Sequence, residues 1–251
     1  MNLFHYTGIQ VRGGETCTIG DTVIKEGRFR LFLNGTLFSR LVASEDMLRE
    51  LGAGFVVSQG LASSVGNVTV SGEDIHVTAA IHGDLEKEIA TTGSVSVRRP
   101  LQKVSSAFCI TKDDVFAITR EIETEVWRKT GGVHCSVLFH EDRVVVKSSD
   151  VGRHNTVDKV IGYAVLQGLD LSRCVIGCTG RQPMDMVSKY AYAGIPIIIS
   201  RAASTDRGIS TAEESGITLV CFSRGDRFTV YTHPERIRDL FPEGEKRSDP
   251  C

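Results

Sequence analysis

The chain has 251 residues, of which 41% are hydrophobic and 24% are charged, and its formal net charge is −2. This composition is typical of a globular protein with a core, and the nearly neutral charge argues against a chain built to coat nucleic acid. No apolar run reaches the roughly 18 residues that a membrane-spanning helix needs, and the first residues lack the pattern of a secretory signal. We therefore expect a soluble, cytoplasmic protein in which any anion-binding site is local.

The seven cysteines are an odd number and show no paired spacings, which indicates a reducing compartment rather than a disulfide framework. Cys174 and Cys178 lie four residues apart in an apolar run, so both would point to one face of a strand. Free cysteines in such a run behave as small buried hydrophobes, and we favour that interpretation. A zinc site is the alternative.

Residues 1–104 are predicted to form a small β-rich domain. Asn34-Gly35 stands between two apolar stretches, and this dipeptide is a strong signal for a two-residue hairpin turn. Ser44, followed by two acidic residues, is predicted to cap the start of a helix that runs towards Gly60. Short alternating stretches within residues 65–99 predict further strands.

In residues 105–251, predicted strands alternate with predicted helices. Thr111, with Asp114 three residues on, predicts a helix that continues past Val126 and ends at Gly131-Gly132. The pattern further predicts helices at 153–166, from Pro183 and near Thr211, and strands at 133–139, 144–147, 174–178, 195–200, 217–222 and 228–231. Such alternation is typical of a sheet with helices on both faces, so we expect three layers.

Four polar, glycine-containing segments fall at the ends of these predicted elements. In a sheet covered by helices, ligands bind outside the carboxyl ends of the strands, where backbone N–H groups and helix N-termini converge. The segments are Thr130–His134, Asp150–Asn155, Thr179–Arg181 and Arg224–Arg227. If they meet at one sheet edge, they form an anion-binding site.

The ten residues from Asp150 to Lys159 are the richest of these stretches in polar groups. Arg153 is suited to a bidentate grip on phosphate, and Gly152 lets a ligand approach the backbone closely. The alternative is a capped helix start with solvated charges. For the Arg224–Arg227 segment, the alternative is an exposed hairpin tip. His154 and Asp158 also leave open a nucleotide-modifying hydrolase, a third possible function.

Cys109 stands in a loop immediately before the Thr111 helix. A helix N-terminus favours the thiolate form of a nearby cysteine, which makes Cys109 a candidate nucleophile; the alternative is a half-buried loop residue beside Phe108. Familiar nucleotide and deaminase signatures are missing. The sequence contains neither a Walker motif, nor a Gly-x-Gly-x-x-Gly turn, nor the His-x-Glu and Pro-Cys-x-x-Cys pair of zinc deaminases.

The chain resembles the FdhD family, the accessory sulfurtransferases of formate dehydrogenase. The resemblance covers nearly the whole chain, and the block from Asp150 to Lys159 is its most specific part. Its motifs are Leu51–Phe55, Ser58–Gly60, Thr130–His134, Asp150–Asn155, Val157–Lys159, Thr179–Arg181, Lys189, Ala193–Pro196, Phe222–Arg224 and Val230–Thr232.

The resemblance implies a cytidine deaminase-like, three-layer domain at 105–251 that lacks the deaminase zinc ligands, behind the small domain at 1–104. It also implies transfer of sulfur, as a cysteine persulfide, from a cysteine desulfurase to a molybdenum (or tungsten) bis-guanine-dinucleotide cofactor destined for formate dehydrogenase. GDP is expected to mimic that cofactor, and a homodimer is possible. We expect no bound metal, nucleic acid or membrane. The predicted cofactor contacts are Gly131, Gly132, His134, Asp150, Arg153, His154, Asn155, Asp158, Lys159, Gly180, Arg181, Phe222, Ser223, Arg224, Gly225, Asp226 and Arg227.

One departure from the family concerns the sulfur carrier. The family's usual carrier is a Cys-x-x-Cys pair in the loop before this helix, whereas here Ser106 to Cys109 provide a single thiol. Two functions therefore stay open. The chain is either a sulfurtransferase with Cys109 as the persulfide carrier, or a cofactor-binding chaperone without sulfur transfer.

Overall fold

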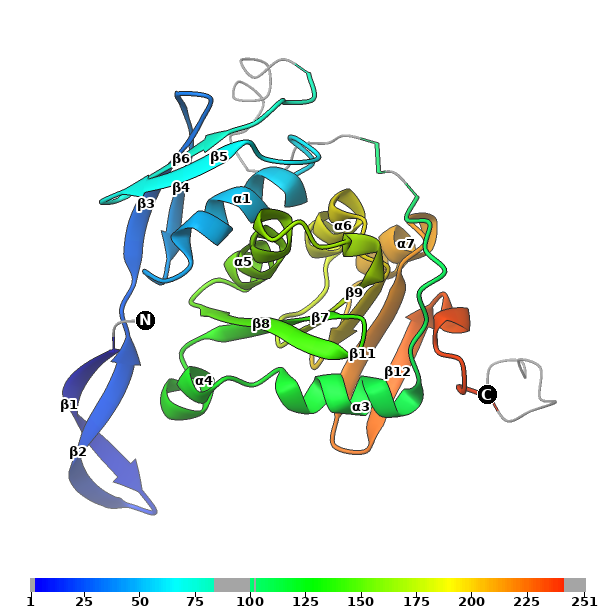
Figure 1. The fold of residues 1–251 in the computed structure, drawn as a ribbon. Coiled ribbons are helices and arrows are strands. Elements are labelled where there is room, and N and C mark those ends of the chain that lie inside the picture. The colour runs from blue at the N-terminus through cyan, green and yellow to red at the C-terminus, as the bar shows by residue number, and fades with distance from the viewer. Residues whose placement is uncertain (1–2, 84–99, 102, 242–251) are drawn as a thin grey trace.

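The computed structural model describes residues 3–83, 100–101 and 103–241, which form a smaller N-terminal part and a larger part around a central sheet (Figure 1). The N-terminal sheet has the strand order β4-β3-β6-β5 and is covered by helix α1. Its elements are β3 (Gly27–Leu33), β4 (Thr36–Ala43), α1 (Leu48–Ser58), β5 (Asn67–Ser71) and β6 (Asp74–Thr78). The predicted strand within 84–99 lies outside the described residues.

The Asn34-Gly35 hairpin is confirmed. Both residues have positive φ (50° and 83°), as a tight turn with the twist of the flanking strands requires. The predicted cap at Ser44 is wrong, because α1 begins three residues later, after Met47 in the left-handed conformation. The Ser44 backbone N–H instead donates to the Asp150 carboxylate in the larger part of the chain.

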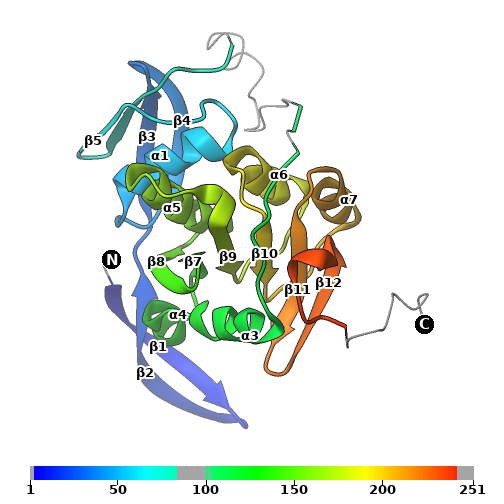
Figure 2. The same ribbon diagram turned by 45° about the vertical axis from the view of Figure 1, so that its right-hand side comes forward.

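A two-stranded ribbon precedes the N-terminal sheet and was not predicted. Strands β1 (Leu3–Arg12) and β2 (Glu15–Ile24) pair along their whole length, and the ribbon projects from the body in both views (Figures 1 and 2). At its base, Ile24 packs beside Gly132 of the larger part. The ribbon therefore meets the body close to one of the predicted site segments.

The central sheet has six strands in the order β12-β11-β10-β9-β7-β8. Strands β9, β10 and β11 run parallel. Strand β12 pairs antiparallel with β11, and β7 pairs antiparallel with both β9 and β8. The strands are β7 (His134–His140), β8 (Arg143–Asp150), β9 (Cys174–Cys178), β10 (Ile197–Ser200), β11 (Thr218–Arg224) and β12 (Arg227–Thr232). These strands match the strands predicted from the sequence closely.

Helices cover both faces of this sheet and complete three layers. Helices α5 (Arg153–Leu166), α6 (Met184–Ala193) and α7 (Asp206–Glu214) pack on one face, and α3 (Lys112–Glu121) and α4 (Glu125–Thr130) on the other. A 3-10 turn, η1 (Leu171–Arg173), lies between α5 and β9, and a second, η2 (Pro234–Arg236), follows β12. The mixed α/β architecture is thus as expected, and the narrower cytidine deaminase-like description stays a prediction.

The helix that begins at Thr111 is shorter than predicted. Its capping box is present, since the Thr111 hydroxyl accepts from the Asp114 N–H and the Asp114 carboxylate accepts from the Thr111 N–H. The prediction that it continues past Val126 is wrong. The chain breaks after Glu121, and Thr124 caps a second helix by accepting a hydrogen bond from the Trp127 N–H. This break places the Trp127 side chain at the edge of the sheet.

The two parts of the chain are joined by the packing of α1 on α5. A Cβ atom on Gly54 would lie 1.7 Å from the Asp158 carbonyl oxygen, and one on Gly162 would lie 1.8 Å from that of Glu50. The backbones therefore touch at both glycines, which only residues without a side chain allow. The division at residues 104 and 105 stays a prediction. Among the helices that are described, none is long and apolar enough to cross a membrane.

Candidate functional site

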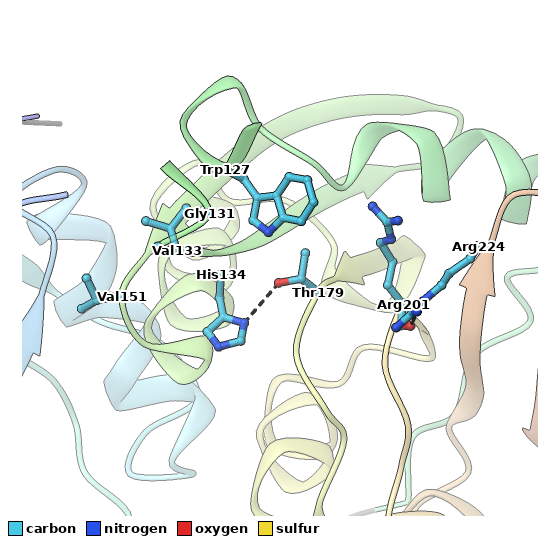
Figure 3. A pocket seen from close by; sticks show the side chains of 9 residues that line it. Trp127, Gly131, Val133, His134, Val151, Thr179, Arg201 and Arg224 are labelled. Carbon is cyan, nitrogen blue, oxygen red and sulfur yellow. Dashed lines mark hydrogen bonds between the residues drawn. The ribbon is translucent and has the colours of Figure 1, made fainter. Parts of the chain in front are cut away.

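A pocket of about 580 Å³ opens at the carboxyl ends of the parallel strands (Figure 3). Each of the four predicted segments contributes to it, so they do converge at one sheet edge. The lining residues are Trp127, Gly131, Gly132, Val133, His134, Val151, Thr179, Arg201 and Arg224. Of the predicted contacts, Gly131, Gly132, His134 and Arg224 lie in the wall. The position of this pocket agrees with the rule for ligands of α/β sheets.

Trp127 and Arg201 line the pocket but were missed by sequence reasoning. Arg201 immediately follows strand β10, so the rule that selected Arg181 after β9 also selects Arg201. Its guanidinium forms an ion pair with Glu123 and lies 5.9 Å from the centre of the Trp127 ring. Trp127 is the only tryptophan of the chain; it is partly buried on a short helix that the sequence did not predict.

Positive charge is concentrated around this pocket. Arg224 Nε donates to the Arg201 carbonyl oxygen at 2.8 Å, and burial, followed by the charge of Arg224, lowers the pKa of Arg201. Burial likewise lowers the pKa of His134, with further contributions from Arg153 and Arg181. In a chain of net charge −2, such a local cluster suits an anionic ligand.

Arg153 adds to the positive charge near the pocket, and one of its hydrogen-bond donors is unused. Its Nε is buried and has no hydrogen-bond partner among the described residues. A buried unpaired donor requires an explanation, and an incoming anion provides one. Gly180 keeps the space beside it open, because a Cβ atom there would lie 3.0 Å from the Arg153 Cβ. Arg181, one residue on, is exposed.

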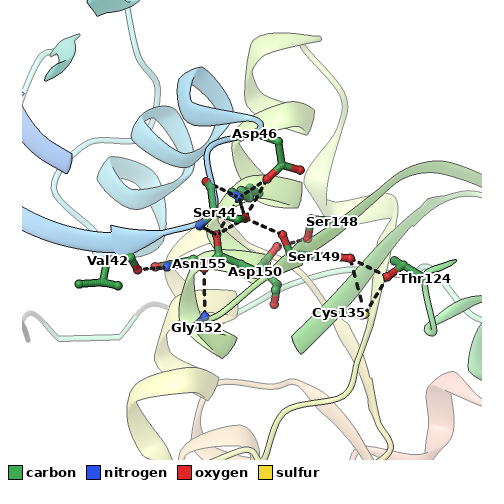
Figure 4. A network of polar contacts seen from close by, with 12 residues as sticks. Val42, Ser44, Asp46, Thr124, Cys135, Ser148, Ser149, Asp150, Gly152 and Asn155 are labelled. Atoms are coloured by element: carbon green, nitrogen blue, oxygen red, sulfur yellow. Dashed lines mark hydrogen bonds and ion pairs between the residues drawn. The ribbon is translucent and has the colours of Figure 1, made fainter. Parts of the chain in front are cut away.

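Asp150, Asn155 and Lys159 lie in the interior instead of lining the pocket. Figure 4 shows the contacts of Asp150 and Asn155. Asp150 Oδ1 accepts hydrogen bonds from the Gly152 N–H at 2.9 Å and from Asn155 Nδ2 at 2.7 Å. Its Oδ2 accepts from the Ser44 N–H at 3.0 Å and lies 2.7 Å from Lys159 Nζ. These three side chains bond protein groups, so their observed contacts support the backbone of the site rather than contact a ligand.

Asp158 is also buried, and it bonds Ser58 Oγ at 2.6 Å and Lys189 Nζ at 2.8 Å. His154, at the start of the same helix, lies 3.4 Å from Asp185. Burial is the main cause that lowers the pKa of His154 to about 4. The Asp158 carboxylate bonds Ser58 and Lys189 and is not part of the pocket wall, so these contacts give no support to the hydrolase alternative.

The turn from Phe222 to Arg227 divides between interior and surface. Ser223 is buried and bonds Thr119 Oγ1 at 2.6 Å, while Phe222 is exposed with a positive φ of 53°. Arg224 reaches the pocket. Gly225, Asp226 and Arg227 are exposed at the hairpin tip and are not part of its wall. One of the two arginines predicted in this turn is therefore at the pocket.

Cys109 is half-buried and lies at the other end of the sheet. Ile110, the next residue, forms a β-bridge with Ile237. Arg236, which precedes Ile237, donates a hydrogen bond to Thr218, the first residue of strand β11. The pocket residue Arg224 is the last residue of β11. A seven-residue strand is about 20 Å long, so the predicted carrier thiol and the pocket lie roughly that far apart.

The other described cysteines show no sign of metal binding. Burial raises the pKa of Cys174 and of Cys221 to about 12, as expected for small core residues. In the described ranges, no group of three or more His, Cys, Asp or Glu residues is arranged to hold a metal ion. The interpretation of Cys174 and Cys178 as buried core residues is the one that their surroundings support.

Comparison with known proteins assigns the chain to a family. The model of the FdhD/NarQ family matches residues 24–238. The chain belongs to the FdhD/NarQ family. It is 36% identical over 238 residues to the sulfur carrier protein FdhD of Methanothermobacter thermautotrophicus, an alignment that covers 87% of this chain and 92% of the relative.

Two further FdhD proteins and one crystal structure extend this likeness. The sulfur carrier protein FdhD of Wolinella succinogenes is 33% identical, with 86% of this chain and 82% of the relative covered. That of Bacillus subtilis is 29% identical, with 90% and 94% covered. A crystal structure described as a formate dehydrogenase accessory protein from Desulfotalea psychrophila superimposes with a TM-score of 0.81, at 29% identity and with 94% and 99% covered. The fold described above is thus that of the FdhD/NarQ family.

Proposed function

We propose that this protein is a sulfur carrier that serves the maturation of a formate dehydrogenase. It would bind a molybdenum or tungsten bis-guanine-dinucleotide cofactor as cargo in the pocket and would carry sulfur on Cys109. The relatives named sulfur carrier protein FdhD support the general role. The observation that carries the cofactor part is the pocket, where an aromatic ring and arginines surround a space of about 580 Å³.

The pocket supplies the two kinds of contact that a nucleotide needs. Arginine side chains bind phosphate through charge-assisted hydrogen bonds, and an aromatic ring offers a stacking surface to a base. Arg201 and Arg224 supply the charge, and Trp127 supplies the ring. The buried, unpaired Nε of Arg153 adds a donor nearby within the described part of the chain.

Calorimetry with GDP tests the cofactor part. Arg224→Gln should weaken GDP binding by roughly tenfold, because it removes a charged hydrogen-bond donor. Arg227→Gln is the matched control, since it removes the same charge from the same hairpin tip but outside the pocket wall. Undetectable binding of GDP to the unaltered protein, or equal losses in both variants, would refute the proposed site.

Sulfur transfer on Cys109 needs only one thiolate. The Cys109 thiolate attacks the outer sulfur of a persulfide on a cysteine desulfurase, the S–S bond of that persulfide breaks, and the desulfurase cysteine leaves as a thiolate. The proton of the outer sulfur travels with it. Atoms, charge and electrons balance without an oxidant. An acceptor nucleophile then takes the outer sulfur by the same exchange, and Cys109 leaves as a thiolate.

Mass spectrometry tests this step. After incubation with an active cysteine desulfurase and cysteine, the peptide that contains Cys109 should gain one sulfur atom. A Cys109→Ser variant should gain none at this position. Cys17 is exposed on the ribbon and serves as the control thiol in the same sample. A persulfide on Cys17 but not on Cys109 would count against the carrier role.

A cofactor-binding chaperone without sulfur transfer is the second candidate. The separation of about 20 Å between Cys109 and the pocket, along the length of strand β11, favours it, because direct transfer requires the reacting atoms to meet. For this candidate, Cys109→Ala should leave maturation of the formate dehydrogenase intact while Arg224→Gln impairs it. Impairment by both variants would favour the sulfur carrier.

A further inference from the structure

Arg236 lies beneath the loop that carries Cys109. The Arg236 carbonyl oxygen accepts a hydrogen bond from the Ile110 N–H at 2.9 Å, and the Arg238 N–H donates to the Ile110 oxygen at 3.0 Å. The residue next to Cys109 is therefore fixed to the chain on both sides of Ile237. The loop and the segment from η2 to Arg238 are thus held together by backbone hydrogen bonds.

The Arg236 side chain points into this unit. It is 8% exposed, its Nη1 donates to Thr218 Oγ1 at 3.2 Å, and its Nε reaches the Ser106 carbonyl oxygen at 3.5 Å. Ser106 is in turn anchored, since its Oγ donates to the Ser172 oxygen at 2.7 Å and accepts from the Phe108 N–H at 3.0 Å. A buried guanidinium thus supports the loop from the side of the body.

The start of helix α3 contributes less positive potential than the sequence led us to expect. The Asp114 carboxylate accepts from the Thr111 N–H, and Asp239 Oδ1 accepts from the Lys112 N–H, both at 2.7 Å. Two carboxylates therefore offset the positive end of this helix. Asp113, also in the first turn of α3, is exposed, and Glu235, next to Arg236 in the sequence, pairs with His233.

Arg236 and the Cys109 sulfur contact adjacent carbonyl groups of the same loop: Cys109 Sγ donates to the Ala107 oxygen at 3.4 Å, and Arg236 Nε reaches the Ser106 oxygen at 3.5 Å. Burial is the main influence on the guanidinium and lowers its pKa, whereas negative charge on Glu235 and on Cys109 raises it. Two other cations are nearby: Lys112 is partly exposed and Arg238 is exposed, so water and salt screen their charges. A buried cation acts on its neighbours with less screening.

We propose that Arg236 is a positioning residue for sulfur transfer, whose guanidinium stabilises the negatively charged sulfur of Cys109. It does so for the thiolate before transfer and for the persulfide anion after it. The inference rests on the proposed sulfur carrier function. It assigns the activation of the thiol to η2, which ends at Arg236, rather than to the start of helix α3.

The test compares alkylation of Cys109 by iodoacetate, which is an anion, and by iodoacetamide, which is neutral. The ratio of the two rates, read peptide by peptide in a mass spectrometer, reports the local positive charge and is insensitive to changes in exposure. Arg236→Gln should lower this ratio at Cys109 by roughly three- to tenfold, whereas Arg236→Lys should retain it. The ratio at Cys17, on the ribbon, should stay constant.

Arg238→Gln is the matched control, because it removes an exposed arginine two residues away. An unchanged ratio in Arg236→Gln, or an equal fall in Arg238→Gln, would overturn the inference. Should Arg236→Gln not fold, Thr218→Val replaces it. That variant keeps the arginine but removes an acceptor of its guanidinium, so it should lower the ratio by about twofold; no change there would also overturn the inference.

Sulfur loading of Cys109 by the desulfurase is measured separately in the same variants. If the unaltered protein takes up no sulfur at Cys109 while its alkylation ratio depends on Arg236, the proposed function fails and the assignment of Arg236 as the partner of this thiol stands. If Cys109 takes up sulfur and its alkylation ratio is independent of Arg236, the proposed function stands and the inference fails.

Discussion

Lys159 Nζ lies 2.7 Å from Asp150 Oδ2, and both side chains are completely buried. Lys159 also donates to Ser44 Oγ at 2.8 Å and to Asp46 Oδ1 at 3.0 Å, so the pair connects helix α5 with the chain before α1. The polar groups that suggested a ligand grip in the sequence thus join the two parts of the molecule. Through the hydrogen bond from the Gly152 N–H to the Asp150 carboxylate, they fix the backbone beside Val151, which lines the pocket.

Lys159→Met should lower the free energy of unfolding by about 3–5 kcal/mol, because it leaves the Asp150 carboxylate buried without its cation. Urea denaturation followed by circular dichroism measures the change. Lys129→Met is the control, since Lys129 pairs with Glu125 on the surface of α4, where water and salt screen the charges and such a pair contributes little. Similar losses of unfolding free energy in both variants would show that the buried pair stabilises the fold no more than the surface pair does.

Gly162→Ala should destabilise the protein by about 1–3 kcal/mol or prevent folding. The added Cβ would lie 1.8 Å from the Glu50 carbonyl oxygen, so helices α1 and α5 would have to separate. Gly20→Ala, on the ribbon, is the control because nothing lies within 4 Å of its added Cβ. If the denaturation midpoint of Gly162→Ala equals that of the unaltered protein, the close packing of the two helices is refuted.

The sequence predicted most of the larger part because its strands and helices alternate with clear caps and turns. Strand β9 and helix α5 have the predicted bounds. The β1–β2 ribbon was missed, since its exposed faces carry no alternation that a core would impose. The convergence of the four segments followed from the rule for strand ends. The same rule could not predict which side chains point outward. The burial of Asp150 and Lys159 depends on Ser44, which is more than 100 residues away in sequence.

Stability should decrease as the pH falls from about 6.5 to about 4, in part because of His154. Burial lowers its pKa to about 4 in the folded protein, so between this value and the ordinary 6.5 the unfolded chain binds a proton that the folded chain does not. The full shift corresponds to about 3 kcal/mol, which we reduce to about 1–2 kcal/mol because the side chain is one-third exposed.

The His154→Gln variant should have a shallower dependence of the unfolding free energy on pH over this range. Urea denaturation at several pH values measures the slope. His5→Gln, on the exposed ribbon, is the control variant and should leave the slope as it is. If His154→Gln and the unaltered protein lose stability in parallel, His154 is not the group responsible.

Trp127 should report ligand binding directly, because it is the only tryptophan of the chain and it lines the pocket. Addition of GDP should change the intensity of its fluorescence, since a stacked base or a displaced Arg201 alters the surroundings of the indole ring. Trp127→Phe should abolish the signal while calorimetry still detects binding. Arg224→Gln should shift the fluorescence titration to higher GDP concentration, and Arg227→Gln should not. If calorimetry detects GDP binding but the fluorescence stays constant, the nucleotide occupies a place other than this pocket.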